Sequence, residues 1–202
     1  MEFGFVKLRG RGKNWATLSD ELKENVFPKF EGTDVSLWGA WYGVFGLGTD
    51  ELFVVTVSEE GQKLADLKEL YRRHADVVEA RLWLPTVRPT GPAPCTKPGL
   101  YVFRSYEVVH EHTEKVASLS QEVWKSFEAA DYFNAEPQGL FRPVGQGGAT
   151  GIMTLVTWYD GLSSWQESRK LPPEALEAVK KRREFIRRSV PIATRLVEGL
   201  PA

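Results

Sequence analysis

The chain has 202 residues, 42% hydrophobic and 26% charged, a composition typical of a globular protein with one large domain or two small ones. Its 26 Lys and Arg residues nearly balance its 27 Asp and Glu residues, so net charge favours neither nucleic acid nor an anionic membrane as a partner. The only cysteine, Cys95, cannot form an internal disulfide, and the sequence shows no signal segment and no apolar run long enough to span a bilayer. We therefore expect a cytoplasmic protein.

The first half of the chain predicts the element order β-α-β-β-α. Residues 2–9 alternate in the manner of a strand. A helix should follow from about residue 17, because Leu18, Leu22, Val26 and Phe30 recur every four positions, and Pro28 should kink or end it. Two strands are expected over 35–47 and 52–58, joined by a glycine-containing hairpin loop, and a second helix over about 61–81.

The segment from residue 85 to residue 98 is rich in proline. It holds five of the twelve prolines, and proline is excluded from helix interiors and central strands. This composition predicts a semi-extended connector, in which we expect Cys95 to have no catalytic role.

The second half predicts the same order of elements. A strand is expected over 100–109, a helix over about 112–130, and two strands over 138–144 and 151–159. A helical stretch from residue 162 should break at Pro172-Pro173 and resume to residue 189, before a short last strand within 192–200. The basic residues 180–183 and 187–188 are then expected on the solvated outer face of that last helix.

The two halves resemble each other. Four segments match in the same order at offsets between 97 and 100 residues, starting with Phe3 and Phe5 against Tyr101 and Phe103. We interpret the chain as a degenerate tandem duplication, with a first repeat over 1–86, a linker over 87–98 and a second repeat over 99–202. The strand over 35–47 is apolar on both faces, so helices should cover one face of each sheet and the other half's sheet the second face. The predicted fold is α+β, with two tandem ferredoxin-like β-α-β-β-α units forming an intramolecular dimeric α/β barrel.

Two segments of the second half resemble NIPSNAP-like proteins. Residues 99–109 (GLYVFRSYEVV) are similar to the first strand of that family, and residues 157–162 (TWYDGL) to its later strand-to-helix signature. His110-Glu111-His112 replaces the Pro-Gly that usually follows the first strand in the family. The resemblance implies the dimeric α+β barrel superfamily, which includes cofactor-independent monooxygenases, lactone isomerases, polyketide cyclases, haem-binding enzymes and members without known activity, so that fold alone does not fix function.

Strand alternation and the resemblance together predict a catalytic and substrate-binding site. Arg104 shares a face with Tyr106, and an arginine buried in a barrel interior should meet an anionic group. We therefore predict Arg104, Tyr106 and His110 as catalytic residues, with Tyr106 or His110 as acid or base and Arg104 stabilising an enolate or carboxylate. The predicted substrate-binding residues are Trp38, Tyr42 and Trp158. The alternative is that these aromatic residues only fill a core, with Arg104 paired to a carboxylate such as that of Glu107.

Three histidines suggest other chemistry. His110 and His112 would face the same way in an extended segment, as metal ligands do, but the sequence favours a solvated corner in which His112 or Thr113 caps the next helix. His74 could bind haem iron, but its neighbours are mostly charged and favour a surface position. No metal or cofactor is therefore predicted.

The leading functional hypothesis is that the chain binds a small hydrophobic or aromatic molecule and transforms it as a cofactor-independent monooxygenase, isomerase or cyclase. The alternatives are a non-catalytic NIPSNAP-like interaction protein and a haem-binding barrel. The expected partner is a small hydrophobic ligand, not nucleic acid or a membrane, and the chain is either a monomeric pseudo-dimer or a homo-oligomer. A cavity of several hundred cubic ångströms that exposes Arg104 would favour ligand binding over the interaction hypothesis.

Overall fold

The structure is a computed structural model that describes residues 1–128, 134–145, 147–170 and 173–201. The chain forms two compact units. The first consists of Met1–Leu84, Gly91–Pro98 and Ile192–Ala202, and the second of Pro85–Thr90 and Gly99–Pro191. The proline-rich segment is thus divided between the units, and the C-terminal residues belong to the first unit, not to the second as the predicted repeat boundaries imply.

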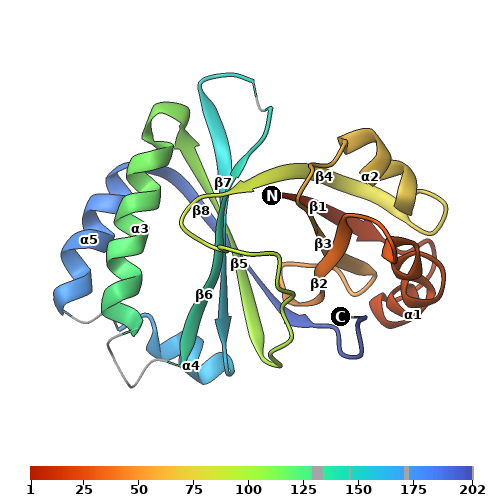
Figure 1. The fold of residues 1–202 in the computed structure, drawn as a ribbon. Coiled ribbons are helices and arrows are strands. Elements are labelled where there is room, and N and C mark those ends of the chain that lie inside the picture. Colours follow the sequence, from red (N-terminus) through yellow and green to blue (C-terminus); the bar gives the residue numbers. More distant parts are fainter. Residues whose placement is uncertain (129–133, 146, 171–172, 202) are drawn as a thin grey trace. The chain divides into compact units, whose positions relative to one another are not determined.

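The first unit has the ferredoxin-like order β-α-β-β-α-β. Its elements are β1 (Glu2–Arg9), α1 (Trp15–Asn25), the 3-10 helix η1 (Phe27–Phe30), β2 (Val35–Phe45), β3 (Glu51–Ser58), α2 (Leu64–Tyr71) and β4 (Asp76–Pro85) (Figure 1). The antiparallel sheet has the order β4-β1-β3-β2. Residues Ala193–Leu196 of β8 (Ile186–Leu196) pair with the free side of β2.

The second unit repeats this arrangement. Its elements are β5 (Leu100–Val109), the 3-10 helix η2 (His110–His112), α3 (Thr113–Glu128), β6 (Ala135–Pro143), β7 (Thr150–Tyr159), α4 (Leu162–Glu167), α5 (Pro173–Glu184) and the start of β8. The strand order β8-β5-β7-β6 is equivalent to that of the first unit, and α3 packs beside α5 (Figure 1). The predicted α+β class with two duplicated ferredoxin-like units is confirmed.

Two predicted helices were too long. The helix expected over 61–81 ends at Tyr71, and Val77 and Val78 lie in β4. The last helix, expected to reach residue 189, ends at Glu184, and Arg187 and Arg188 lie in β8. In both cases apolar residues continue at a spacing that also fits a helix, so periodicity alone could not mark the change to a strand. The predicted break at Pro172 and the end of the helix expected over 112–130 lie outside the described residues.

The core of the first unit fills the space between its sheet and its helices. Val6 and Leu8 of β1 pack with Leu18 and Leu22 of α1, and each of the four side chains is fully buried. The side chain of Asn14 accepts a hydrogen bond from the backbone N–H of Thr17 at 3.0 Å and so caps α1. The space between the sheet and the helices of the first unit is therefore a packed apolar core.

Candidate functional site

A cavity of about 450 Å³ lies within the second unit, where α3 and α5 cover the face of the sheet made by β5, β6 and β7. Its volume is in the range of small-molecule sites. Part of its wall is apolar, from Val123, Trp124, Leu155, Val179 and Ile186. Six arginines also line it: Arg104, Arg169, Arg182, Arg183, Arg187 and Arg188. The described lining contains no acidic side chain, so the cavity combines an apolar wall with strong positive charge.

Strand alternation places Arg104 and Tyr106 on the cavity side of β5. They pair with Leu155 and Met153 of β7, and residues directly opposite each other in a sheet share a face. The shared face of Arg104 and Tyr106 is as the sequence predicted, but it is the face that the helices cover, not the face that was expected to look into a barrel interior. The helix α3 contributes Trp124 to the apolar core beside Tyr106.

Arg104 is held by two phenols. Its guanidinium donates hydrogen bonds to the hydroxyl oxygens of Tyr106 and Tyr159. Burial by itself lowers the pKa of Arg104, but the two tyrosines raise the pKa above its ordinary value, so the side chain remains charged. Each tyrosine accepts from Arg104 and still has its own proton to donate, and both line the cavity. The alternative pairing with the carboxylate of Glu107 is not found among the described residues: the main influences on the pKa of Arg104 are burial and the two tyrosines.

Arg182 of α5 is a member of the site that the sequence did not reveal. Its side chain is 8% exposed, and its guanidinium carbon lies 5.7 Å from the centre of the Tyr106 ring. One terminal nitrogen donates to the hydroxyl of Ser120 at 3.3 Å, whereas its Nε has no partner among the described residues. A buried guanidinium N–H without a partner is costly, and a ligand oxygen would satisfy it.

The two arginines change the acidity of Tyr106, which is 2% exposed. Burial by itself raises the pKa of the phenol, but the positive charges of Arg182 and Arg104 and the hydrogen bond from Arg104 outweigh it. The pKa of Tyr106 therefore lies below its ordinary value. A phenol with a lowered pKa beside two cations can take up and release a proton and can stabilise an anionic ligand.

The other predicted site residues lie away from the cavity. His110 is exposed in η2, where its backbone N–H donates to the carbonyl of Ala149. Trp158 lies on the opposite face of the sheet from the cavity, because it pairs with Tyr101. In the first unit, Tyr42 stacks on Trp15 with ring centres 3.8 Å apart, and Trp38 lines a separate, mainly apolar hollow of about 190 Å³.

That smaller hollow also contains Cys95. The thiol is buried, and burial raises its pKa well above the ordinary value, so it remains protonated at neutral pH. A protonated, buried thiol is a poor nucleophile.

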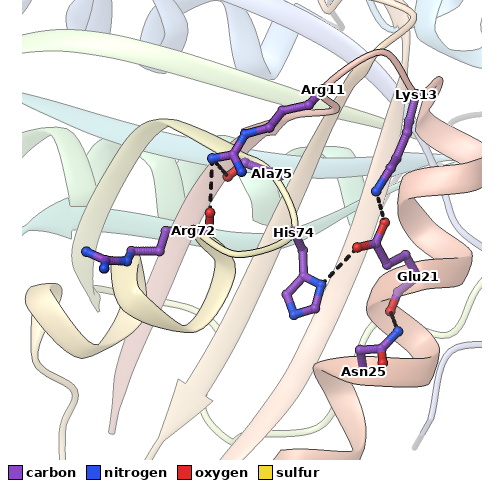
Figure 2. Close-up of polar contacts among 7 residues, drawn as sticks. All are labelled: Arg11, Lys13, Glu21, Asn25, Arg72, His74 and Ala75. Carbon is purple, nitrogen blue, oxygen red and sulfur yellow. Dashed lines mark hydrogen bonds and ion pairs between the residues drawn. The ribbon is translucent and has the colours of Figure 1, made fainter.

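None of the three histidines lines the cavity. His74 belongs to the first unit, and its Nδ1 lies 2.9 Å from a carboxylate oxygen of Glu21, which also pairs with Lys13 (Figure 2). In the 3-10 helix η2, His110 and His112 do not face the same way as they would in the extended segment assumed from the sequence. The described residues contain no group of three or more potential metal ligands. The cavity therefore offers no imidazole to haem iron.

Comparisons with known proteins agree on the fold. No protein-family model matches the chain, and no curated protein matches it in sequence. Solved structures do match. An anthrone oxidase-like protein has a TM-score of 0.58 at 14% identity and covers 98% of this chain and 92% of its own. A proposed monooxygenase of Fusobacterium nucleatum has a TM-score of 0.59 at 10% identity, and the match covers 98% of this chain and 93% of the monooxygenase. A chlorite dismutase variant from Candidatus Nitrospira defluvii has a TM-score of 0.61 at 11% identity, and the match covers 97% of this chain and 91% of the dismutase.

These similarities show a shared fold of tandem ferredoxin-like units. At such low identity they transfer no residue role. Among the described residues, no helix is long and apolar enough to cross a bilayer.

Proposed function

We propose that the second unit binds a small anionic molecule with an aromatic or otherwise apolar body in the cavity beneath α3 and α5. The observation that carries this proposal is the buried Arg182, whose Nε has no partner and which lies beside Arg104 and Tyr106. A carboxylate or enolate oxygen at this position would accept hydrogen bonds from both arginines, and such charge-assisted bonds are the strong ones. The apolar body would contact Leu155 and Val179.

The same arrangement supports a proton transfer at carbon. Tyr106, as the phenolate, would take a proton from a carbon next to a carbonyl group, and the electron pair of the broken C–H bond would move onto the carbonyl oxygen. Arg104 and Arg182 would stabilise the resulting enolate, and the Tyr106 phenol would then return the proton to a carbon or to the oxygen. No cofactor takes part in this sequence, which is an isomerisation.

The test uses phenylpyruvate, which combines a carboxylate, an aromatic ring and an enolisable CH2 group. Exchange of its benzylic protons with deuterated solvent, followed by NMR, should be accelerated by the protein. Tyr106→Phe should lower that acceleration by about 100-fold. Arg104→Gln should raise the dissociation constant for phenylpyruvate by about 10- to 100-fold. The control is Arg142→Gln, since Arg142 is exposed in β6 and does not line the cavity.

Exchange that is unaffected by both cavity substitutions would refute the proposal. Binding that depends on Arg104 without any acceleration of exchange would keep the ligand-binding function and remove the enzymatic one. If neither binding nor exchange occurs, the non-catalytic NIPSNAP-like interaction function becomes the better explanation.

Oxidation is a second candidate, which the fold favours because two similar structures are described as a monooxygenase and as anthrone oxidase-like. Phenolates and enolates are the electron-rich forms of an organic substrate, and the cationic cavity stabilises such forms. Dioxygen would be the oxidant. Uptake of dioxygen with a phenolic ligand, abolished by Tyr106→Phe, would support oxidation over isomerisation.

A further inference from the structure

Four of the six cavity arginines are exposed and form its rim: Arg169, Arg183, Arg187 and Arg188. Within the described part of the chain none of the four forms an ion pair with a carboxylate. Two other exposed cations of this unit do form such pairs, Lys170 with Glu167 and Lys180 with Glu177. The rim is therefore a local excess of positive charge in a chain that is nearly neutral as a whole.

The rim charge is not a by-product of a solvated helix face. Arg183 comes from the end of α5, whereas Arg187 and Arg188 come from β8, after the helix has ended at Glu184. Arg169 follows α4, and its guanidinium lies 5.3 Å from the centre of the Trp165 ring. The pKa of Arg169 lies below its ordinary value, first because of partial burial and then because of the positive charge of Arg104. Three separate segments thus bring like charges to one opening, where they repel one another.

The inner and outer arginines differ in what they can hold. Arg104 and Arg182 lie deep, and two phenols and one serine hydroxyl already take up part of their donor capacity. They suit a single anionic oxygen or one carboxylate. The four rim arginines are exposed and have no such partners among the described residues, so they offer many more donors than the same carboxylate could use. Leu155 and Val179 belong to the apolar part of the wall.

We propose that the natural ligand is an anion charged at two different ends, an inner carboxylate or enolate at Arg104 and Arg182 and an outer phosphoryl group at the rim, joined by an apolar body. A phosphoryl group carries up to two charges and several oxygens, and the planar guanidinium binds it in a bidentate manner. This inference rests on the proposed function, because it takes the inner end to be the group that Arg104 and Arg182 hold.

The experiment compares two probes by isothermal titration calorimetry. The first is para-hydroxycinnamate, which has the inner carboxylate and an apolar body, and the second is its phosphate monoester, which adds the outer group. On the unmodified protein we expect the phosphate monoester to bind about 10- to 100-fold more tightly. The double variant Arg183→Gln/Arg187→Gln should reduce this difference to about threefold or less, with little change for para-hydroxycinnamate.

The matched control is Lys180→Gln/Lys181→Gln. It removes the same number of positive charges, from positions in α5 close to Arg183 in the sequence, but both lysines are exposed and neither lines the cavity. The affinity difference between the two probes should persist in this control. If it is lost equally there, the phosphate responds only to overall charge, and the rim site is refuted.

The remaining outcomes separate the two proposals. If para-hydroxycinnamate binds in a manner that depends on Arg104 and the phosphate adds less than about threefold, the inference of an outer phosphoryl group fails and the proposed function stands. If neither probe binds, or if Arg104→Gln changes neither affinity, both fail. If a short single-stranded RNA binds more tightly than the phosphate monoester and loses affinity in the rim double variant, the rim is a nucleic-acid surface and the inference is wrong.

Discussion

The two units differ most at equivalent positions of their first strands. At the offset of 98 residues that aligns Phe3 with Tyr101, Val6 corresponds to Arg104 and Leu8 to Tyr106. Val6 and Leu8 are fully buried in an apolar core beneath α1 and α2, whereas Arg104 and Tyr106 line a cavity beneath α3 and α5. The same architecture therefore gives a closed core in one unit and an open, charged site in the other, through a change of residue type and not of topology.

The treatment of charge differs as well. In the first unit the buried carboxylate of Glu51 has two cationic partners, Lys7 and Arg9, each at 2.9 Å. In the second unit the buried Arg182 has Ser120 and a Tyr106 ring but no carboxylate among the described residues. A compensated buried charge contributes to the folded structure, whereas an uncompensated one favours the binding of a counter-ion, in agreement with the ligand site that we propose for the second unit.

The largest expected effect comes from placing the residue of the second unit into the first. Val6→Arg would bury a charge without a partner between Val54 and Ala80, and should lower the free energy of unfolding by about 4 kcal/mol or more. The reciprocal Arg104→Val should change it by about 1 kcal/mol or less, because an apolar replacement of a buried charge is often neutral or stabilising. Urea denaturation measures both, and equal losses would contradict the contrast between core and site.

A smaller effect concerns the acidity of Tyr106. Because its folded pKa lies below the ordinary value, the unfolded chain binds more protons between the two pKa values, and the free energy of unfolding should rise with pH across that interval. Below the folded pKa this contribution is lost. Arg182→Gln should raise the pKa of Tyr106 by about one unit or more, which a tyrosinate absorbance titration detects by difference from Tyr106→Phe.

The matched control for this titration is Arg183→Gln, next in sequence but exposed and not among the main influences on the pKa of Tyr106. It should leave the titration almost unchanged. An equal shift in both variants would mean that general positive charge, and not the contact between Arg182 and Tyr106, sets the acidity.

The smallest effect concerns the start of α1. Asn14→Ala removes the hydrogen bond to the backbone N–H of Thr17 and should cost about 1 kcal/mol of stability, whereas Asn14→Asp should retain most of it. Thermal unfolding measures the loss. The affinity of the second unit for para-hydroxycinnamate should be unaffected. A parallel loss of affinity would contradict the expectation that the α1 cap acts only on the stability of the first unit.

The sequence by itself determined the duplication, the α+β class and the cavity-side pair. Aligned aromatic and apolar positions repeat in the two halves, and alternation along residues 100–109 places Arg104 and Tyr106 on one face, because both are local properties of the chain. Alternation could not tell which face the helices would cover. The predicted Trp38 and Tyr42 lie in the first unit, and Trp158 lies on the far face of the β5–β7 sheet, so aromatic content did not distinguish core from site.

Only the tertiary structure decided the role of the arginines. The sequence places Arg182 in a basic run that is expected to be solvated, but it is part of the site because α5 packs beside α3 and buries it over Tyr106. Arg187 and Arg188 reach the cavity because the chain leaves the helix at Glu184 and enters β8. Which face of a helix is buried, and where a helix gives way to a strand, depends on packing between distant segments, which local periodicity does not encode.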